Sequence, residues 1–239
     1  SASSPVARSH TYPFPLDAIV LAGTHTNPKR LIAGRNKAFL EVGGTPLISH
    51  VVKALIEAET IGQIFVIGPA EELKETLQDF PDTVRIIAQK GKMLSNAWAC
   101  IEASEDFHRG DADMPVEDRP LLVISCDLPL ATARSIDDFV ARCAAEDARF
   151  DGGYAMLCGV ADETSLEKYY PADGKPGIVR PYVNFRDSRQ RLANIYVGRP
   201  RLLTNQALLQ AGFDHRKMVK LKNVLAMSWT FLRQAGSWQ

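Results

Sequence analysis

The stretch DAIVLAGTHTNPKRLIAGRNKAFLEV, residues 17–42, opens with the apolar run Ala18–Leu21, which stops at Gly23 and gives way to a polar loop. The run is short, β-branched and apolar on both faces, which is typical of a strand in a parallel sheet covered by helices. A glycine lets successive backbone N–H groups approach a phosphate. The loop has no Walker A motif and no G-x-G-x-x-G. From this stretch alone, a phosphate-binding loop and a solvated connection are equally well supported. Four basic residues follow Gly23 within it: Lys29, Arg30, Arg35 and Lys37.

Similar apolar runs recur along the first two thirds of the chain, at Gln63–Ile67, Val84–Ala88 and Leu121–Ser125. Helical periodicity lies between and after them, at residues 47–56, 71–80, 93–103 and 136–144. Alternating strands and helices predict an α/β fold, a doubly wound, mostly parallel sheet of the Rossmann-like kind.

The pattern changes after residue 150. Gly153–Cys158 predicts another strand, and the segments Ile178–Phe185 and Leu192–Val197, separated by a polar stretch, predict an added β-hairpin. The chain ends in a helical pattern with one apolar face and a basic end. We therefore expect a flexible N-terminus at 1–15, an α/β domain at 16–200 and C-terminal helices at 201–239.

The composition restricts the partners. The 239 residues carry a net charge of zero, which gives no argument for nucleic acid as a partner. No apolar run reaches the roughly 18 residues of a membrane span, and no signal peptide is apparent, so we expect a cytoplasmic protein. The C-terminal helix is expected to pack on the domain or on a second copy in a homodimer; contact with a membrane surface is the less favoured alternative. The cysteines sit in apolar runs and predict buried, reduced thiols: Cys100, Cys126, Cys143 and Cys158.

Asp127 directly follows the apolar run Leu121–Ser125. Ligands of doubly wound sheets bind beyond the carboxyl ends of strands, and a carboxylate there suits a hard cation such as Mg²⁺. The alternative is that Asp127 caps a turn or the helix that begins near Thr132.

Taken together, three motifs resemble those of the MobA-like nucleotidyltransferases. The first is Leu21-Ala22-Gly23 at the end of a strand, followed by an Arg and then by Lys37. The second is Gly44-Thr45-Pro46-Leu47-Ile48 at a helix start, and the third is Asp127-Leu128-Pro129-Leu130. The resemblance covers roughly residues 16–200 and implies the fold of that family.

The resemblance also implies roles for single residues. Arg30 and Lys37 would bind phosphate, with Lys29 or Arg35 as alternatives to Arg30. Asp127 would hold Mg²⁺, and Asn194 would add a second oxygen ligand, with Asp187 the weaker candidate. The loop around an NTP triphosphate would consist of Leu21, Ala22, Gly23 and Thr24. Gln89 and Asn96 would read the nucleobase, and Arg180 and Tyr182 would line the acceptor side.

The implied reaction is Mg²⁺-dependent transfer of a nucleoside monophosphate from an NTP to a phosphorylated small-molecule acceptor, with release of pyrophosphate. The chain departs from the family pattern at Thr24, which replaces a second loop glycine and would be strained at a positive φ. The loop to Lys37 is also longer. These departures keep open a nucleotide- or metabolite-binding protein without turnover. A Rossmann-type oxidoreductase is disfavoured, because the glycine fingerprint is missing and Gly68 and Pro69 stand where an acidic residue would end the second strand.

Overall fold

The computed structural model describes residues 11–24, 34–111, 115, 119–172, 174–177 and 182–203. The chain divides into two compact units, Ser1–Pro200 and Arg201–Gln239, and the fold below is that of the first. Several predictions lie outside the described residues: those for Lys29, Arg30 and Arg180, for the first ten residues and for the C-terminal helices.

One seven-stranded sheet forms the centre of the first unit, in the order β5–β4–β1–β6–β9–β7, with β8 paired to β9. Four strands are parallel, and we call them with their helices the parallel half. They are β1 (Leu16–Leu21), β4 (Ile61–Gly68), β5 (Val84–Ala88) and β6 (Leu121–Ser125). The sheet confirms the predicted α/β class, and Val84–Ala88 and Leu121–Ser125 are strands with the predicted bounds.

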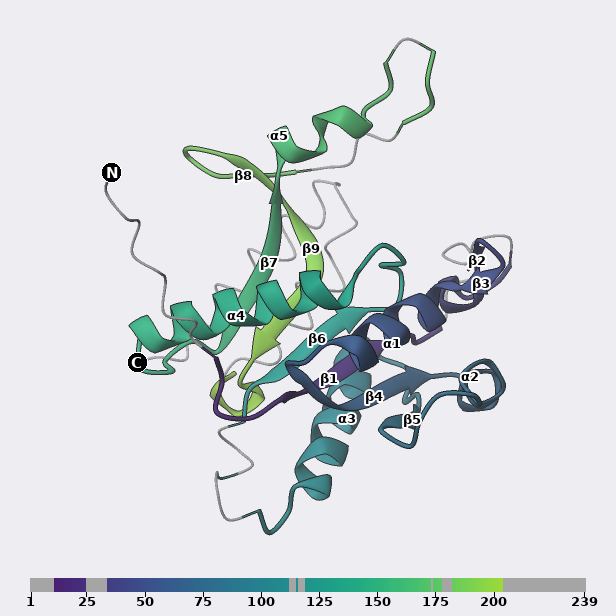
Figure 1. Ribbon diagram of the computed structural model, residues 1–239, viewed down its shortest axis with the longest axis vertical. Coiled ribbons are helices and arrows are strands. Elements are labelled where there is room, and N and C mark those ends of the chain that lie inside the picture. Colours follow the sequence, from purple (N-terminus) through teal and green to yellow (C-terminus); the bar gives the residue numbers. More distant parts are fainter. Residues whose placement is uncertain are drawn as a thin grey trace, which may run out of the picture. The chain divides into compact units, whose positions relative to one another are not determined.

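Helices cover both faces of the parallel half (Figure 1). Alternate residues of β1 point to opposite faces. Ala18 and Val20 share a core cluster with α1 (Leu47–Glu57) and α4 (Ala133–Arg149), while Ile19 belongs to a second cluster with α3 (Met93–Phe107). The short helix α2 (Ala70–Thr76) contributes Leu73 to the first cluster. Strands that are apolar on both faces are buried between helices, as the sequence predicts.

The remaining strands form what we call the antiparallel half: β7 (Met156–Asp162), β8 (Val183–Asn184) and β9 (Arg189–Gly198), with α5 (Glu163–Leu166) and the 3₁₀ turn η4 (Glu167–Tyr169). β9 runs antiparallel to both β6 and β7. In Figure 1, β7 and β9 rise away from the parallel strands and carry α5 and β8 at their far end.

The predicted hairpin is present, with Val183 opposite Gln190. However, β9 begins at Arg189, inside the polar segment that the sequence assigns to the turn. β7 also begins three residues later than predicted. Because this hairpin is exposed, three of the four residues in its ladder are polar, and hydrophobic alternation does not mark where it starts.

A small hairpin precedes α1, formed by β2 (Glu41–Val42) and β3 (Thr45–Pro46). Its turn residues Gly43 and Gly44 have φ values of 62° and 76°, a left-handed conformation that glycine adopts without strain. This hairpin lies directly between the 3₁₀ helix η2 (Lys37–Phe39) and α1, so Lys37 is held close to the core.

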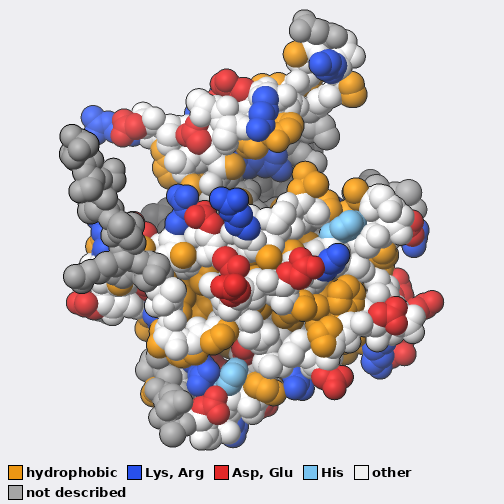
Figure 2. All heavy atoms as spheres, in the orientation of Figure 1, with side chains coloured by type: hydrophobic (Ala, Val, Ile, Leu, Met, Phe, Trp, Pro, Cys, Tyr) orange, Lys and Arg blue, Asp and Glu red, His pale blue; other side chains and the backbone are white. Residues whose placement is uncertain are grey.

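Three surface features bear on the predictions. Cys100, Cys126 and Cys143 are buried, but Cys158 on β7 is exposed, so the prediction of a buried thiol there was wrong. Within the described segments, no helix is long and apolar enough to cross a membrane. On the face shown in Figure 2, basic and acidic side chains are interspersed, in keeping with the zero net charge.

Candidate nucleotide site

The carboxyl ends of the parallel strands meet in one place. The Ala22 N–H donates to the Ile67 carbonyl at 2.8 Å, and the Gln89 N–H donates to the Gly68 carbonyl at 3.0 Å. Gly68 fits because a Cβ there would lie 2.8 Å from the Ala22 carbonyl oxygen. The ends of β1, β4 and β5 are therefore tied together where doubly wound sheets bind ligands.

Lys37 and Asp127 approach each other across this edge. Lys37 is the first residue of η2, and Asp127 follows the end of β6. The Lys37 Nζ lies 3.1 Å from the Asp127 Oδ2, and the Ser125 hydroxyl donates to Oδ1 at 2.5 Å. The two side chains are 42% and 25% exposed, so the pair is open to a ligand and partly screened by solvent.

The Asp127 carboxyl is held in its ionised form. Burial alone would raise its pKa, but the hydrogen bonds from Ser125 and Lys37, together with the Lys37 charge, lower it below its ordinary value. The neighbouring Cys126 responds in the opposite way, because burial and the nearby Asp127 charge raise its pKa to about 12. The site thus offers a carboxylate and an ammonium group, while the Cys126 thiol is neutral and a poor nucleophile.

Asp127 is not the cap of helix α4. That helix is capped by Thr132, whose hydroxyl accepts from the Ser135 N–H at 3.2 Å in a reciprocal capping box. Asp127 itself lies in the turn that follows β6, and its carboxylate faces Lys37 and Ser125.

Side-chain amides from two elements hold the segment Ala22–Thr24. The Asn36 Nδ2 donates to the Ala22 carbonyl at 2.8 Å and to the Thr24 hydroxyl at 3.1 Å. The Gln89 Oε1 accepts from the Thr24 N–H at 2.8 Å. Gln89, expected as a base-reading residue, therefore uses its oxygen to fix the loop.

Asn96, near the start of α3, lies beside the same segment. A Cβ on Gly23 would come within 2.8 Å of the Asn96 Nδ2, so any other residue at this position would force the Asn96 amide or the loop to shift. The Asn96 Oδ1 accepts from the Lys90 N–H at 2.6 Å. Among the described non-glycine residues, positive φ occurs at Asp151 and Asn194. Thr24 is therefore free of the strain expected from its replacement of a glycine.

The second predicted metal ligand sits at an irregular point of β9. Ile195 is paired with Ile124, so extending the register by one residue places Asn194 level with Ser125. Asn194 has φ 58°, and the pairing of β7 with β9 shifts its register at this point. A left-handed asparagine at a bulge redirects the strand, as expected near functional sites. Within the described residues, no three His, Cys, Asp or Glu side chains gather as a metal site.

The acceptor-side and alternative residues are placed elsewhere. The Tyr182 hydroxyl accepts from that of Tyr170 at 2.8 Å, in a network within the antiparallel half. Asp187 lies in the hairpin turn closed by the hydrogen bond from Phe185 N to Ser188 O. Arg35 is exposed. No contact on the described residues joins these three to the Lys37–Asp127 pair.

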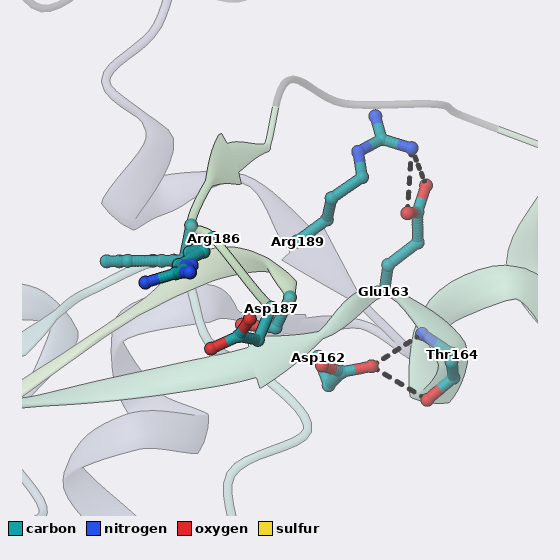
Figure 3. Close-up of a pocket in the computed structure, with 8 residues that line it drawn as sticks. Asp162, Glu163, Thr164, Arg186, Asp187 and Arg189 are labelled. Carbon is teal, nitrogen blue, oxygen red and sulfur yellow. Dashed lines mark hydrogen bonds and ion pairs between the residues drawn. The ribbon is translucent and has the colours of Figure 1, made fainter.

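The same hairpin forms a separate pocket of about 360 Å³ with the start of α5 (Figure 3). Arg189 makes an ion pair with Glu163, its Nη1 lying 2.6 Å and 2.7 Å from the two carboxylate oxygens. Asp162 caps α5 by accepting from the Thr164 N–H at 3.0 Å. Within this pocket, Glu163 and Arg189 are thus engaged with each other, and Asp162 is engaged with the backbone of α5.

Two site residues were missed from the sequence. Asn36 stands directly before Lys37, and its Oδ1 accepts from the Ala38 N–H at 3.0 Å as the cap of η2. Ser125 is the last residue of β6. The cap preference of Asn at a helix start was a usable signal for Asn36; nothing in the pattern separated Ser125 from an ordinary strand residue.

Comparison with known proteins identifies the family of this chain. A family model for the MobA-like NTP transferase domain matches residues 18–184. The 2-C-methyl-D-erythritol 4-phosphate cytidylyltransferase of Chlorobium luteolum is 30% identical over 129 residues, which are 52% of each chain. The bifunctional protein GlmU of Sinorhizobium fredii is 27% identical over 178 residues, which are 73% of this chain and 36% of that one. The chain thus spans about half, or less, of the length of these relatives.

Two solved structures share the fold. A hypothetical transferase from Thermus thermophilus superposes with a TM-score of 0.60 at 19% identity, over 90% of this chain and 77% of that one. A CMP:2-keto-3-deoxy-manno-octonic acid synthetase complexed with CTP gives a TM-score of 0.51 at 15% identity, over 94% and 86%. With the family model covering most of the first unit, the chain belongs to the MobA-like NTP transferase family.

Proposed function

We propose that this protein transfers a nucleoside monophosphate from an NTP to a phosphorylated small-molecule acceptor and releases pyrophosphate. The observation that carries the proposal is the 3.1 Å approach of Lys37 to Asp127 beside the Ala22–Thr24 loop. A cation and a carboxylate at the end of a buried sheet suit a phosphoryl transfer that needs alignment and charge compensation rather than a covalent nucleophile.

Each residue then has a task. The loop from Leu21 to Thr24 lies against the triphosphate, with Gly23 allowing close approach of the backbone. Lys37 offsets charge on the α-phosphate and on the leaving pyrophosphate. Gln89 and Asn96 have their oxygens on backbone N–H groups, so their NH₂ ends are left to donate to a base. Arg30 is proposed as a further phosphate ligand from the resemblance alone.

The donor set fits a divalent cation such as Mg²⁺. The Asp127 carboxylate is ionised, and a carboxylate has more lone pairs than its hydrogen bonds to Ser125, to Lys37 and to the backbone use. Asn194 would add an amide oxygen, and substrate phosphates and water would complete the shell. Such a cation supplies charge compensation for phosphate oxygens.

The test is pyrophosphate release from each of the four NTPs with a panel of phosphorylated acceptors, with and without Mg²⁺. The name of the Chlorobium relative makes CTP and a methylerythritol phosphate the first pair to try. We expect Asp127→Asn to lower turnover at least about a hundredfold without loss of the fold. Asp138→Asn is the matched control, because Asp138 is an exposed α4 residue paired with Arg142.

Two results would overturn the proposal. Full activity of Asp127→Asn would show that the reaction does not take place at the site proposed around Asp127. Tight NTP binding by the wild-type protein, detected as a thermal shift, with no pyrophosphate from any acceptor would favour the alternative of a binding protein without turnover. The homodimer and the membrane contact concern residues outside the described chain and stay predictions.

A further inference from the structure

Asn36 connects two parts of the site that are separate in the sequence. Its Nδ2 donates to the Ala22 carbonyl and to the Thr24 hydroxyl, at the end of β1. Its Oδ1 accepts from the Ala38 N–H and so caps η2, the 3₁₀ helix that begins with Lys37. One carboxamide thus joins the phosphate loop to the backbone that carries the Lys37 ammonium group.

The arrangement requires an amide. The Asn36 side chain acts as an acceptor toward η2 and as a double donor toward the loop, a combination that neither a carboxylate nor a hydroxyl of that length provides. The roles of its two ends follow from their partners, because Oδ1 faces an N–H donor and Nδ2 faces a carbonyl oxygen.

Thr24 takes part in this arrangement through both its side chain and its backbone. Its φ is not in the left-handed region, so a side chain is tolerated. Its hydroxyl supplies an acceptor for Asn36, while its N–H is held by Gln89 at 2.8 Å. Both the side chain and the backbone of Thr24 are therefore fixed by residues from other elements before any ligand binds.

We infer that Asn36 is a positioning residue, which with Thr24 forms a clamp that holds the phosphate loop and Lys37 in register for the NTP. The inference rests on the proposed function and deepens it. Where a second glycine would leave the loop backbone mobile, the clamp holds it in one conformation. The conformational entropy of the loop is therefore lost when the protein folds, and not when the nucleotide binds.

The test uses Asn36→Ser, which keeps a short neutral acceptor for the η2 cap but cannot reach Ala22. We expect kcat/KM for the NTP to fall about tenfold, mostly through a higher KM, because both hydrogen bonds from Asn36 to the loop are lost and the Ala22 carbonyl is left unsatisfied. KM for the acceptor stays unchanged. A purely structural role would instead lower the active fraction, and so kcat, without changing KM.

Variants at Thr24 give an independent arm. Thr24→Val removes the hydroxyl and should raise the NTP KM about threefold. Thr24→Ser keeps the hydroxyl, so its NTP KM should equal that of the wild type. In the Asn36→Ser background, Thr24→Val should add nothing. Thr60→Val is the matched control: its hydroxyl donates to Asp137 at 2.6 Å at the opposite end of β4, so stability falls while the NTP KM is unchanged.

Hydrogen exchange in the nucleotide-free protein separates this inference from the proposed function. Asn36→Ser should speed exchange of the Thr24 amide and leave β4 protected. Unchanged exchange at Thr24 together with an unchanged NTP KM would overturn the clamp. If the wild-type protein released no pyrophosphate, the proposed function would fail, and exchange alone would decide the clamp. If Asn36→Ser did not fold, the Thr24→Val and Thr24→Ser pair would decide it.

Discussion

The parallel and antiparallel halves of the sheet differ in how far their side chains are buried from solvent. In β1, five of six residues are buried, and Leu122 and Ile124 of β6 are fully buried. In β7 and β9, one residue each is buried, and apolar side chains such as Val160 and Leu192 are 48% and 47% exposed. The parallel half is stabilised by a core that helices cover. The antiparallel half is stabilised by the hydrogen bonds between its strands and by polar contacts such as Arg189–Glu163.

The difference in burial between the two halves matters for the position of the proposed site. The proposed site stands on the ends of the buried strands, where packing fixes the backbone, and its polar side chains add the last constraints. Among the described residues of the antiparallel half, Asn194 is the one that the proposal assigns to this site, and it lies on the strand that borders β6. The outer part of that half carries its own charged pocket, formed by the β8–β9 hairpin and the start of α5 (Figure 3).

The largest expected effect comes from a matched pair of core substitutions. Leu122→Ala removes a fully buried side chain from β6 and should cost about 3 kcal/mol of unfolding free energy, through lost burial and a cavity. Leu192→Ala removes a half-exposed side chain and should cost less than about 0.5 kcal/mol. Urea unfolding followed by circular dichroism measures both. Equal losses would contradict the contrast between the two halves.

The next effect compares two cations. Lys37→Met should lower kcat about a hundredfold, because charge on the phosphates is left without its ammonium partner. Arg189→Met breaks the ion pair with Glu163 in the antiparallel half and should leave kcat within about twofold, since that pair is exposed. Steady-state pyrophosphate release distinguishes them. A large loss in Arg189→Met would mean that the hairpin takes part in the reaction.

A smaller effect is expected at Gly23. Gly23→Ala places a Cβ 2.8 Å from the Asn96 Nδ2, so either the loop or the buried amide has to shift, at a cost of about 1–2 kcal/mol. Adding Asn96→Ala should relieve the overlap and recover part of that stability. Thermal unfolding of the single and double variants tests this. Strict additivity would show that the overlap is not the cause.

The smallest effect concerns pH. Because the folded-state pKa of Asp127 is lowered, its contribution to stability is present above the ordinary Asp value of about 3.9 and disappears as the pH falls through the folded value. The difference in unfolding free energy between wild type and Asp127→Asn should therefore shrink on acidification below pH ~4, by less than about 1 kcal/mol given the exposure of the pair. Denaturant titrations between pH ~7 and ~3 measure it. A difference that grows on acidification would contradict this assignment.

The sequence predicts the parallel half well, because burial leaves an apolar signal in β1, β4 and β6. The edge strand β5 has no buried residue, and its mostly apolar sequence was enough to predict it. The sequence also brings Lys37, Asp127, Gln89 and Asn96 to one edge. Individual side-chain contacts could not be predicted from the sequence, because they depend on tertiary geometry. Examples are the hydrogen bond that the Gln89 oxygen accepts from the loop and the bonds of Asn36 to both the loop and η2. Cys158 and the start of β9 were missed because an uncovered strand shows no clear periodicity.

The position of β9 has a consequence for how the chain is made. β9 is inserted between β6 and β7, although it follows both in the sequence. Until residues 189–198 leave the ribosome, the apolar edge of β6 has no neighbour on that side, and β7 has no partner in the sheet. An unpaired apolar edge is a template for association with other chains. A chain truncated before β9 should therefore aggregate, although it would contain Lys37 and Asp127 and every strand of the parallel half.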